Sequence, residues 1–250
     1  MKKPLISIIT ACFNSDATIK STIESVLNQS YDNIEYVLID GNSQDKTLDI
    51  IKSYEQKFQN KGIIYKWISE PDNGIYNAFN KGLKLSKGEW ISFVGSDDIY
   101  TNNAIELYVK NIPNNEVDLL YSNIKIIGKK PHNEVWSWEK FRRRMNIAHV
   151  GALHNRKYFK RYGDFNTSYR IAGDYELLLR AKENLKTFKL NELTVIMSDI
   201  GISNKLIKEV YKETKRAKKE TAQIPRIICQ LDYFIWMLKY RIKKMLYALV

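Results

Sequence analysis

Short apolar runs alternate with apolar residues at helical spacing along the first hundred residues of the chain. Continuous runs are typical of strands buried on both faces, and they predict strands at Leu5–Ala11, Ile34–Ile39, Ile63–Ile68 and Trp90–Val94. Helical spacing predicts a helix through Ile19, Ile23, Val26 and Leu27 that Ser15 or Asp16 caps, a second through Leu48, Ile51 and Phe58 after the turn at Gly41–Ser43, and a third over Ile75–Leu85.

The pattern is less regular in the second half of the chain. It predicts a strand over Asp118–Ile127, a turn at Lys129–Asn133, an amphipathic helix over Gly173–Lys182, a charged helix over Ile202–Thr221 and, after Pro225, a last helix over Arg226–Val250. We therefore expect one globular domain over residues 1–201, followed by basic amphipathic helices over residues 202–250.

Strands that alternate with helices of this length are typical of βαβ units. The predicted fold class is α/β, with a mostly parallel sheet flanked by helices on both faces and a helical C-terminal tail. A chain of 250 residues with 44% hydrophobic and 27% charged residues is long enough for a full core and excludes wholesale disorder. Two distant cysteines, Cys12 and Cys229, supply neither a disulfide framework nor a metal cluster.

Two kinds of membrane segment are also weighed on the sequence. The run Leu5–Phe13 follows two lysines as a secretory signal would, but Asn14, Ser15 and Asp16 come next instead of a small-residue cleavage pattern, so a buried strand is the better interpretation. No uncharged apolar stretch reaches the roughly 20 residues that cross a bilayer.

The net charge of +12 is unevenly distributed. Residues 202–250 hold nine Lys and three Arg against three Glu and one Asp, a net charge of +8. A nucleic-acid reader would carry its charge on the reading domain, so this distribution disfavours a polyanion-binding module and assigns the basic tail a separate role.

Small and acidic residues follow three of the predicted strands, at Thr10–Asn14, Asp40–Ser43 and Gly95–Asp98. Ligands of parallel α/β sheets bind beyond the carboxyl ends of the strands, so these loops would meet at a nucleotide site. For any one loop, capping of the following helix is an equal alternative. Two adjacent carboxylates, Asp97 and Asp98, repel each other and favour a bound Mg²⁺ or Mn²⁺ that also holds substrate phosphates.

Four segments in order and spacing carry a family resemblance, namely SIITACFNS, IDGNSQDKT, SEPDNGIYNAFNKGLKLSKGEWISFVGSDD and IAGDYELLLR. Together they resemble the family 2 glycosyltransferases, inverting enzymes of the GT-A fold that use a sugar nucleotide. The resemblance runs from about residue 5 to residue 180. Within it, the stretch Glu70–Gly82 is most similar to bacterial enzymes that build surface polysaccharides. It implies a hexosyltransferase-type GT-A catalytic domain over residues 1–201, a divalent metal cofactor (Mn or Mg), a UDP-sugar donor and a glycan or lipid-linked acceptor.

The resemblance also implies roles for single residues. It places Thr10, Ala11 and Asn14 beside the nucleobase and ribose, Asp40 on the base, Asn80 and Lys81 near the nucleotide, Asp97 near the ribose or metal, Asp98 on the metal and Asp174 as catalytic base. Inverting transfer needs such a base and no protein nucleophile, because a sugar hydroxyl attacks the anomeric carbon in one displacement.

The sequence departs from the family pattern at three positions. Gly41 stands where many relatives have a second acid, Phe79 where many have Arg, and Gly173 where many have Glu. The last difference makes Glu176 an alternative to Asp174 as base, although two residues along a helix it points to a different face.

Other polar groups keep more than one interpretation. His149 either contacts diphosphate or acceptor or is structural, whereas His154 is expected to be structural and His132 a loop residue. The run Arg142–Arg144 is a solvated face or a phosphate contact. A sugar-nucleotide pyrophosphorylase is the alternative enzyme, and it would need a Gly-rich basic loop that Thr10–Asn14 lacks.

The last predicted helix has an aliphatic face and an aromatic face. Ile227, Leu231, Phe234, Ile235, Leu238, Ile242, Met245 and Leu249 form the first, and Tyr233, Trp236, Tyr240 and Tyr247 the second, flanked by Lys239, Arg241, Lys243 and Lys244. A basic helix of this kind suits an anionic membrane surface, which predicts a cytoplasmic protein held peripherally at the inner face of the cell membrane. Packing of the aliphatic face on the domain, or a homodimer, is the alternative.

Overall fold

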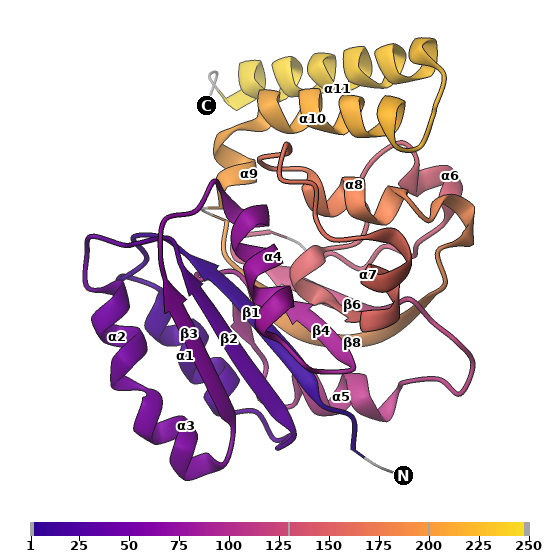
Figure 1. Cartoon of the computed structure of the whole chain (residues 1–250). Helices are drawn as coiled ribbons and strands as arrows, with labels where there is room; N and C mark the ends of the chain where they lie inside the picture. The colour runs from indigo at the N-terminus through magenta and orange to yellow at the C-terminus, as the bar shows by residue number, and fades with distance from the viewer. Residues whose placement is uncertain (1–2, 130, 200, 248–250) are drawn as a thin grey trace.

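The computed structural model describes residues 3–129, 131–199 and 201–247. An eight-stranded sheet runs through the middle of the domain in the order β3-β2-β1-β4-β7-β6-β8-β5 (Figure 1). The first half of the chain supplies the parallel strands β1 (Ile6–Cys12), β2 (Ile34–Asp40), β3 (Ile64–Ser69) and β4 (Trp90–Phe93). The predicted α/β class with a mostly parallel sheet is confirmed, and Leu5–Phe13 lies largely in the central strand β1 instead of in a leader.

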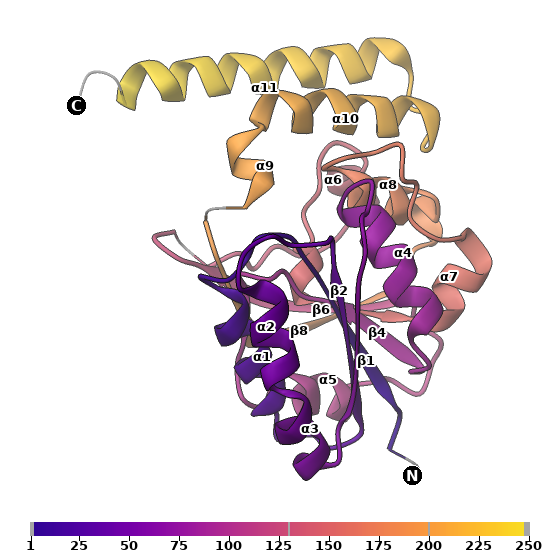
Figure 2. The ribbon, with the colours of Figure 1, turned by 60° about the vertical axis from the view of Figure 1, so that its left-hand side comes forward.

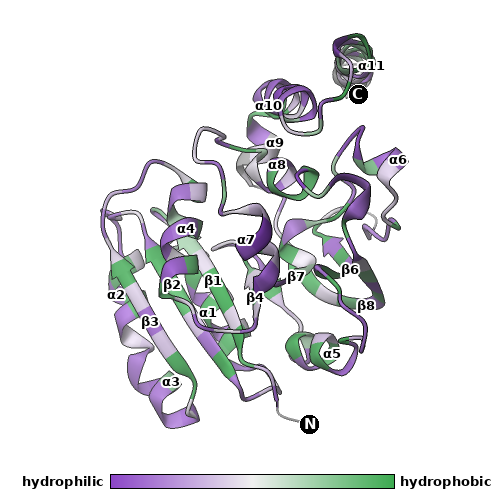
Figure 3. Cartoon of the chain, turned by 45° about the vertical axis from the view of Figure 1, so that its right-hand side comes forward, coloured by the Kyte–Doolittle hydropathy of each residue, from purple (hydrophilic) through white to green (hydrophobic). Residues whose placement is uncertain are grey.

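Helices cover both faces of the sheet, as predicted. One face packs against α1 (Ile19–Leu27), α2 (Thr47–Ser53), α3 (Glu55–Lys61) and α5 (Ala104–Lys110). The other packs against α4 (Ile75–Leu85), α6 (Trp138–Phe141), α7 (Arg156–Tyr162) and α8 (Gly173–Leu179). Strand β1 is mostly apolar because both of its faces are covered: Ile8 faces the first layer of helices and Ile9 the second. In Figure 3, β1 and β4 carry more green than α3 and α7, in line with this layering.

The second half of the sheet is mixed in direction. Strand β7 (Ala152–Asn155) runs antiparallel between β4 and β6 (Leu119–Ile126), and the short β5 (Ile99–Tyr100) runs antiparallel to β8 (Thr187–Met197). Strand β8 pairs parallel with β6 through an irregular register. Of these, only β6 was predicted.

Four predicted details are wrong. The single helix expected over Ile202–Thr221 is two helices, Ile202–Lys205 and Ile207–Glu220. The helix expected after Gly41–Ser43 is two helices, α2 and α3, that meet at Tyr54. Neither Ser15 nor Asp16 caps α1 with its side chain; the Ser15 carbonyl instead accepts from the Ile19 N–H at 2.9 Å. The helix expected over Gly173–Lys182 ends at Leu179, and a 3-10 turn at Lys182–Asn184 follows.

The tail forms a helical pair above the sheet domain (Figure 2). After the short α9 (Ile202–Lys205), α10 (Ile207–Glu220) lies against α8, and α11 (Arg226–Tyr247) turns back along α10. Asp232 of α11 accepts from Lys218 of α10 and from Arg143 of the domain, at 2.9 Å from Arg143 Nη2. Ala217 and Cys229 are buried in the same core as α8. The helical pair is therefore fastened to the domain by both a core and an ion-pair cluster.

Helix α11 turns its aliphatic face outward. Seven of its apolar side chains are 41–70% exposed, namely Ile227, Leu231, Phe234, Ile235, Leu238, Ile242 and Met245. The aromatic face packs inward, with the Trp236 ring 5.3 Å from that of Tyr211 on α10. Packing of the aliphatic face on the domain is thus contradicted for these residues. Leu249 and Val250 lie outside the described residues, as do the side chains of Lys243, Lys244 and Tyr247. Among the described residues, no helix has the length and apolar character to cross a membrane.

Candidate active site

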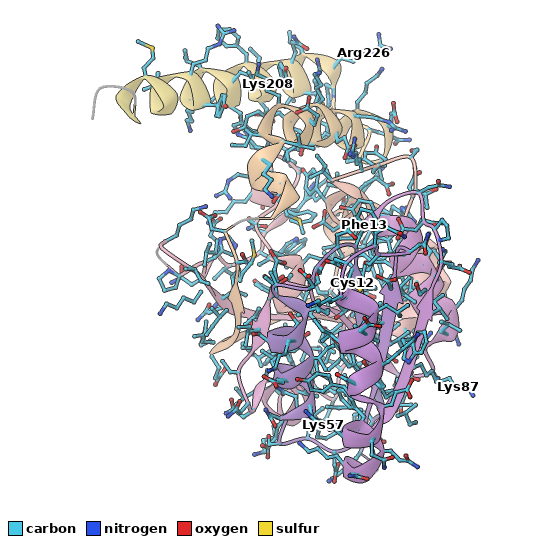
Figure 4. The ribbon with its side chains drawn as sticks, turned by 90° about the vertical axis from the view of Figure 1, so that its left-hand side faces the viewer. Cys12, Phe13, Lys57, Lys87, Lys208 and Arg226 are labelled. Atoms are coloured by element: carbon cyan, nitrogen blue, oxygen red, sulfur yellow. The ribbon has the colours of Figure 1, made fainter. Side chains whose placement is uncertain are left out.

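The loops that follow β1, β2 and β4 meet at one edge of the sheet, as the sequence predicts. The backbone N–H of Asn14 donates to Ser43 Oγ at 2.8 Å, and the Ser15 and Ser96 hydroxyls are 3.0 Å apart. Asn14 has a positive φ of 48°, a conformation that Asn tolerates better than most residues, and its Oδ1 accepts from the Gln44 N–H. Figure 4 shows Cys12 and Phe13 at this edge, on the side of the sheet domain that lies toward α10 and α11.

Thr10 and Asp40 lie at the floor of this edge and are fully buried. The Thr10 hydroxyl accepts from Tyr36 at 3.1 Å, whereas Ala11 is half-buried. The Asp40 carboxylate accepts from the hydroxyls of Ser43 and Ser69, which ties the loops after β2 and β3 together. These residues shape this edge of the sheet, and their contacts with a nucleotide stay predictions.

Two residues at the same edge were not singled out on the sequence. Phe13 is 60% exposed, although the other apolar residues of its run are buried or half-buried. A Cβ atom on Gly41 would lie 2.8 Å from Asp72 Oδ2 and 3.4 Å from the Phe13 ring. The Asp72 carboxylate therefore occupies the space that a second acid after Asp40 would need, while its Oδ1 accepts from the Gly74 N–H at 2.8 Å. The signal that the sequence offered for Phe13 was an aromatic residue just after a predicted strand.

Asn80 and Lys81 of α4 are engaged with the protein. The Asn80 amide donates to the Phe165 carbonyl at 2.8 Å and accepts from its N–H at 2.9 Å. Lys81 donates to the Pro71 carbonyl at 2.9 Å and pairs with Glu70 at 2.8 Å. Asn80 thereby fixes the segment before α8, and Lys81 holds the loop that contains Asp72. Contact of either side chain with a nucleotide stays a prediction.

Asp97 and Asp98 converge on Gly95. A Cβ atom there would lie 2.6 Å from Asp98 Oδ2 and 3.0 Å from Asp97 Oδ1, so only glycine leaves this space open between the carboxylates. Asp98 Oδ1 accepts from the Ser198 N–H at 3.0 Å. Burial, followed by the charge of Asp97, raises the pKa of Asp98 to about 7. Two carboxylates that lie this close together and repel each other fit a hard divalent cation, which would take its remaining ligands from phosphate and water. No group of three metal-ligating side chains gathers within residues 3–129, 131–199 and 201–247.

Asp174 lies at the start of α8 and is partly exposed. Its Oδ1 accepts from the Tyr175 N–H at 2.8 Å and from the Tyr76 hydroxyl at 3.3 Å, and Tyr76 also donates to the Ile171 carbonyl. Desolvation raises the pKa of Asp174 to about 6. A carboxyl group that titrates near neutral pH, with Oδ2 not used by these bonds, is suited to accept a proton.

The two candidate bases, Asp174 and Glu176, differ in their surroundings. A Cβ atom on Gly173 would lie 2.7–2.9 Å from three carbons of the Tyr76 ring, which explains why the Glu of many relatives is missing here. Glu176 is buried, forms a two-point ion pair with Arg180 at 3.1 and 2.6 Å, and accepts from Thr221. These donors occupy the Glu176 carboxylate, so the geometry favours Asp174.

His149 and His154 lie together against the Phe93 ring, apart from His132. The His149 ring stacks on Phe93 with centroids 5.1 Å apart, and burial lowers its pKa to about 3. His149 is therefore neutral at physiological pH, and any contact with diphosphate would be a neutral hydrogen bond. His154 is fully buried against Phe93 and Phe159, in line with a structural role. His132 lies in a loop, where its Nε2 is 3.0 Å from the Asn146 carbonyl.

The fold and the carboxylates at the sheet edge define a glycosyltransferase of the GT-A type. The chain belongs to glycosyl transferase family 2, whose model matches residues 7–176. A PGL/p-HBAD biosynthesis glycosyltransferase from Mycobacterium bovis is 27% identical over 220 residues, which is 84% of each chain.

Two solved structures share the fold. S. aureus TarS in complex with UDP-GlcNAc matches with a TM-score of 0.68 and 17% identity, over 92% of this chain and 70% of that chain. The mannosyltransferase PcManGT from Pyrobaculum calidifontis, in complex with GDP-Man and Mn²⁺, matches with a TM-score of 0.71 and 14% identity, over 94% and 70%. Both confirm the predicted GT-A fold.

Proposed function

We propose that this glycosyltransferase moves a sugar from a nucleoside-diphosphate donor to a hydroxyl group of a glycan or lipid-linked acceptor, with inversion at the anomeric carbon. The observation that carries the proposal is Asp174, a partly exposed carboxyl group with a pKa of about 6 that is separate from the Asp97–Asp98 pair. A single displacement needs one carboxyl group that takes the proton of the acceptor hydroxyl. It also needs a second site that holds the donor diphosphate.

Asp174 acts on the acceptor. Its Oδ1 is held by Tyr175 and Tyr76, so Oδ2 takes the proton of the attacking hydroxyl. As the proton moves, the hydroxyl oxygen bonds to the anomeric carbon and the bond from that carbon to the donor phosphate breaks. The leaving nucleoside diphosphate departs on the opposite side of the sugar, which inverts the configuration.

The donor lies at the edge formed by β1, β2 and β4. Phe13 offers an exposed ring for the nucleobase, and Asp72 supplies a carboxylate beside Gly41. The UDP-GlcNAc in the TarS structure and the GDP-Man in the PcManGT structure support a donor of this class, and we propose a UDP-sugar. The relative from M. bovis is named for PGL/p-HBAD biosynthesis, and we propose a role in cell-surface polysaccharide biosynthesis for this chain.

Asp98, with Asp97 beside it, is the proposed holder of a divalent cation, Mn²⁺ or Mg²⁺. The Mn²⁺ in the PcManGT structure supports this choice. When bound, such an ion supplies positive charge that offsets the charge of the diphosphate leaving group.

The function is tested in two steps with the full chain. Nucleoside diphosphates with Mn²⁺ should raise the melting temperature of the parent and of Asp174→Asn, but not that of Asp98→Ala; the exposed Asp49→Ala is the matched control. A screen of nucleotide sugars by mass spectrometry then identifies the donor, and Asp174→Asn should bind it without transfer. Unchanged nucleotide binding by Asp98→Ala would refute the metal assignment, and full transfer by Asp174→Asn the choice of base.

We further propose that the protein works at the cytoplasmic face of the cell membrane, with the aliphatic face of α11 in the lipid surface. That face is exposed along the helix, and Arg226 and Arg241 are exposed cations on the same helix. Apolar residues would enter the lipid boundary and the cations would meet anionic headgroups. The helical pair lies toward the edge of the sheet that carries Phe13, which would bring the site near a membrane-bound acceptor (Figure 4).

Vesicle co-sedimentation tests this docking. Phe234→Gln with Leu238→Gln removes two side chains of the stripe, each worth about 1.5–3 kcal/mol when fully buried, so binding to anionic vesicles should fall at least tenfold. Ile127→Gln with Val135→Gln changes two equally exposed apolar residues of the domain and is the control. Equal binding by both double variants would contradict membrane docking and leave a homodimer through α11 as the alternative.

A further inference from the structure

Two hollows lie where α11 passes over α6 and α10. The first encloses about 350 Å³ and is lined by the cations Lys140, Arg143, Arg144 and Lys239 beside Trp236. The second encloses about 410 Å³ and shares Arg144, Trp236 and Lys239 with the first, while Tyr211 and Thr214 add hydroxyl groups. Because they share these three residues, we treat them as one feature, the α6–α11 groove.

Positive charge in the α6–α11 groove exceeds negative charge. Its first hollow has four cationic side chains against two acids, and its second has two cations and no acid. Arg143 pairs with Asp232 at 2.9 Å, and Arg144 pairs with Glu134 at 2.7 Å. Lys140 and Lys239 form no ion pair with any residue that the structure describes, and both are exposed. Two cations are thus available to an anion that enters the groove.

The groove opens beside the aliphatic face of α11. Ile235 belongs to that face and also lines the first hollow, and Lys239 follows it by one helical turn. Trp236 turns inward, where its ring meets Tyr211 of α10. A lipid with its tail along the exposed stripe would therefore place its headgroup directly at the cations.

The walls of the groove contact the helix that bears the catalytic base. The Phe141 carbonyl of α6 accepts from the Tyr175 hydroxyl at 2.7 Å. Glu213 of α10, one residue before Thr214, accepts from the N–H groups of Arg170, Ile171 and Ala172 at 2.8 Å each. Helix α10 thereby holds the backbone before Asp174 and α6 holds the side chain of Tyr175 after it, so the groove lies on the acceptor side of the enzyme.

We propose that the α6–α11 groove binds the phosphate or diphosphate headgroup of the membrane lipid that carries the acceptor sugar. The inference rests on the proposed function and deepens it, because it names the acceptor class. Converging Lys and Arg side chains with hydroxyl donors match the chemistry of a multiply charged phosphate group. A groove of this volume can enclose a single phosphate or diphosphate headgroup, whereas a flat basic surface would attract any anionic lipid.

The test measures binding of the full chain to phosphatidylcholine vesicles that contain a few mole percent of a polyprenyl diphosphate. Vesicles with phosphatidylglycerol at equal charge form the second arm, and inorganic diphosphate in solution the third. The variant is Lys140→Gln with Lys239→Gln, which breaks no ion pair of the described residues. Lys57→Gln with Lys87→Gln removes two exposed lysines far from the helical pair and is the matched control (Figure 4).

We expect the variant to lose at least tenfold in affinity for the polyprenyl diphosphate vesicles, while its binding to phosphatidylglycerol vesicles falls no more than that of the control. Equal loss on both vesicle types would assign the lysines to general membrane attraction and overturn the proposal, as would no loss at all. Binding of inorganic diphosphate as tight as that of the lipid would also overturn it. Stabilisation by nucleoside diphosphates with Mn²⁺ reports the donor site separately, so failure of the proposed function is distinguishable.

Discussion

Replacement of Asp174 by Asn should abolish transfer and at the same time stabilise the fold at neutral pH. Desolvation raises the pKa of this carboxyl group from 3.8 to about 6, so the charged form is disfavoured in the folded protein. Asn keeps an acceptor for the Tyr175 N–H and the Tyr76 hydroxyl but carries no charge. The substitution thus removes the free-energy cost of a charged carboxylate at this position.

The magnitude follows from the pKa. A pKa difference of one between the folded and unfolded chain corresponds to about 1.36 kcal/mol of unfolding free energy. The rise from 3.8 to about 6 therefore costs the folded protein about 3 kcal/mol at neutral pH. Because water reaches part of this side chain, we expect a gain of about 2 kcal/mol in the free energy of unfolding. For a chain of this length, that gain raises the melting temperature by about 4–8 °C.

The sign of the pH dependence makes the reasoning testable. A raised carboxyl pKa lowers stability as pH rises from about 4 to about 6, so the advantage of Asp174→Asn should be full above pH 6 and vanish near pH 4. Urea unfolding at pH 7.5, 6, 5 and 4 measures it, with Asp49→Asn as the control at an exposed aspartate. A variant no more stable than the parent at pH 7.5, or an advantage independent of pH, would refute the argument.

Further predictions concern the base, the nucleotide edge and the packing beside Asp174. The kcat/KM of transfer should fall about tenfold for each pH unit below the Asp174 pKa of about 6, and a flat profile down to pH 5 would contradict the assigned base. Phe13→Ala should weaken nucleotide binding by about 1–3 kcal/mol in calorimetry if its exposed ring stacks on the base. Gly173→Ala should destabilise the chain by about 1–3 kcal/mol in urea unfolding, because its Cβ would meet the Tyr76 ring. Helix propensity alone predicts a gain of up to about 1 kcal/mol, so a stabilised Gly173→Ala would show that the ring yields.

Periodicity was enough to predict the parallel half of the sheet. Strands β1, β2 and β4 are buried on both faces, whereas β3 is a half-buried edge strand, and α4 was predicted with its observed bounds, Ile75–Leu85. Strand β8 was missed because its mixed burial lacks a clean alternation, and β5 because two residues carry no period. Pairing with distant strands, which no local pattern records, defines both.

Motifs located the strand-end loops and Asp174, and the structure decided what each side chain does there. Glu176 and Asp174 are equivalent as carboxylates in a sequence, but the ion pair with Arg180 occupies one and leaves the other to Tyr76. The missing acid at Gly41 looked like a loss, whereas Asp72 occupies that space from a loop 31 positions along the chain. Such substitutions act through space, so a one-dimensional pattern cannot show them.

The sequence by itself determined the resemblance to a class of enzyme, because the four motifs that carry the resemblance are local features, and it located the basic charge in residues 202–250. Only the tertiary structure decided which face of α11 meets the protein. Both faces are apolar enough to pack, and the choice depends on the buried Lys218–Asp232 pair and on Trp236 against Tyr211. Those contacts join α10 to α11 and turn the aliphatic face outward, beside the groove where Lys140 and Lys239 lack an acidic partner among the described residues. The buried Asp232 carboxylate reaches Lys218 in only one orientation of α11, and an unpaired buried charge would be costly. The periodicity of the sequence does not contain that constraint.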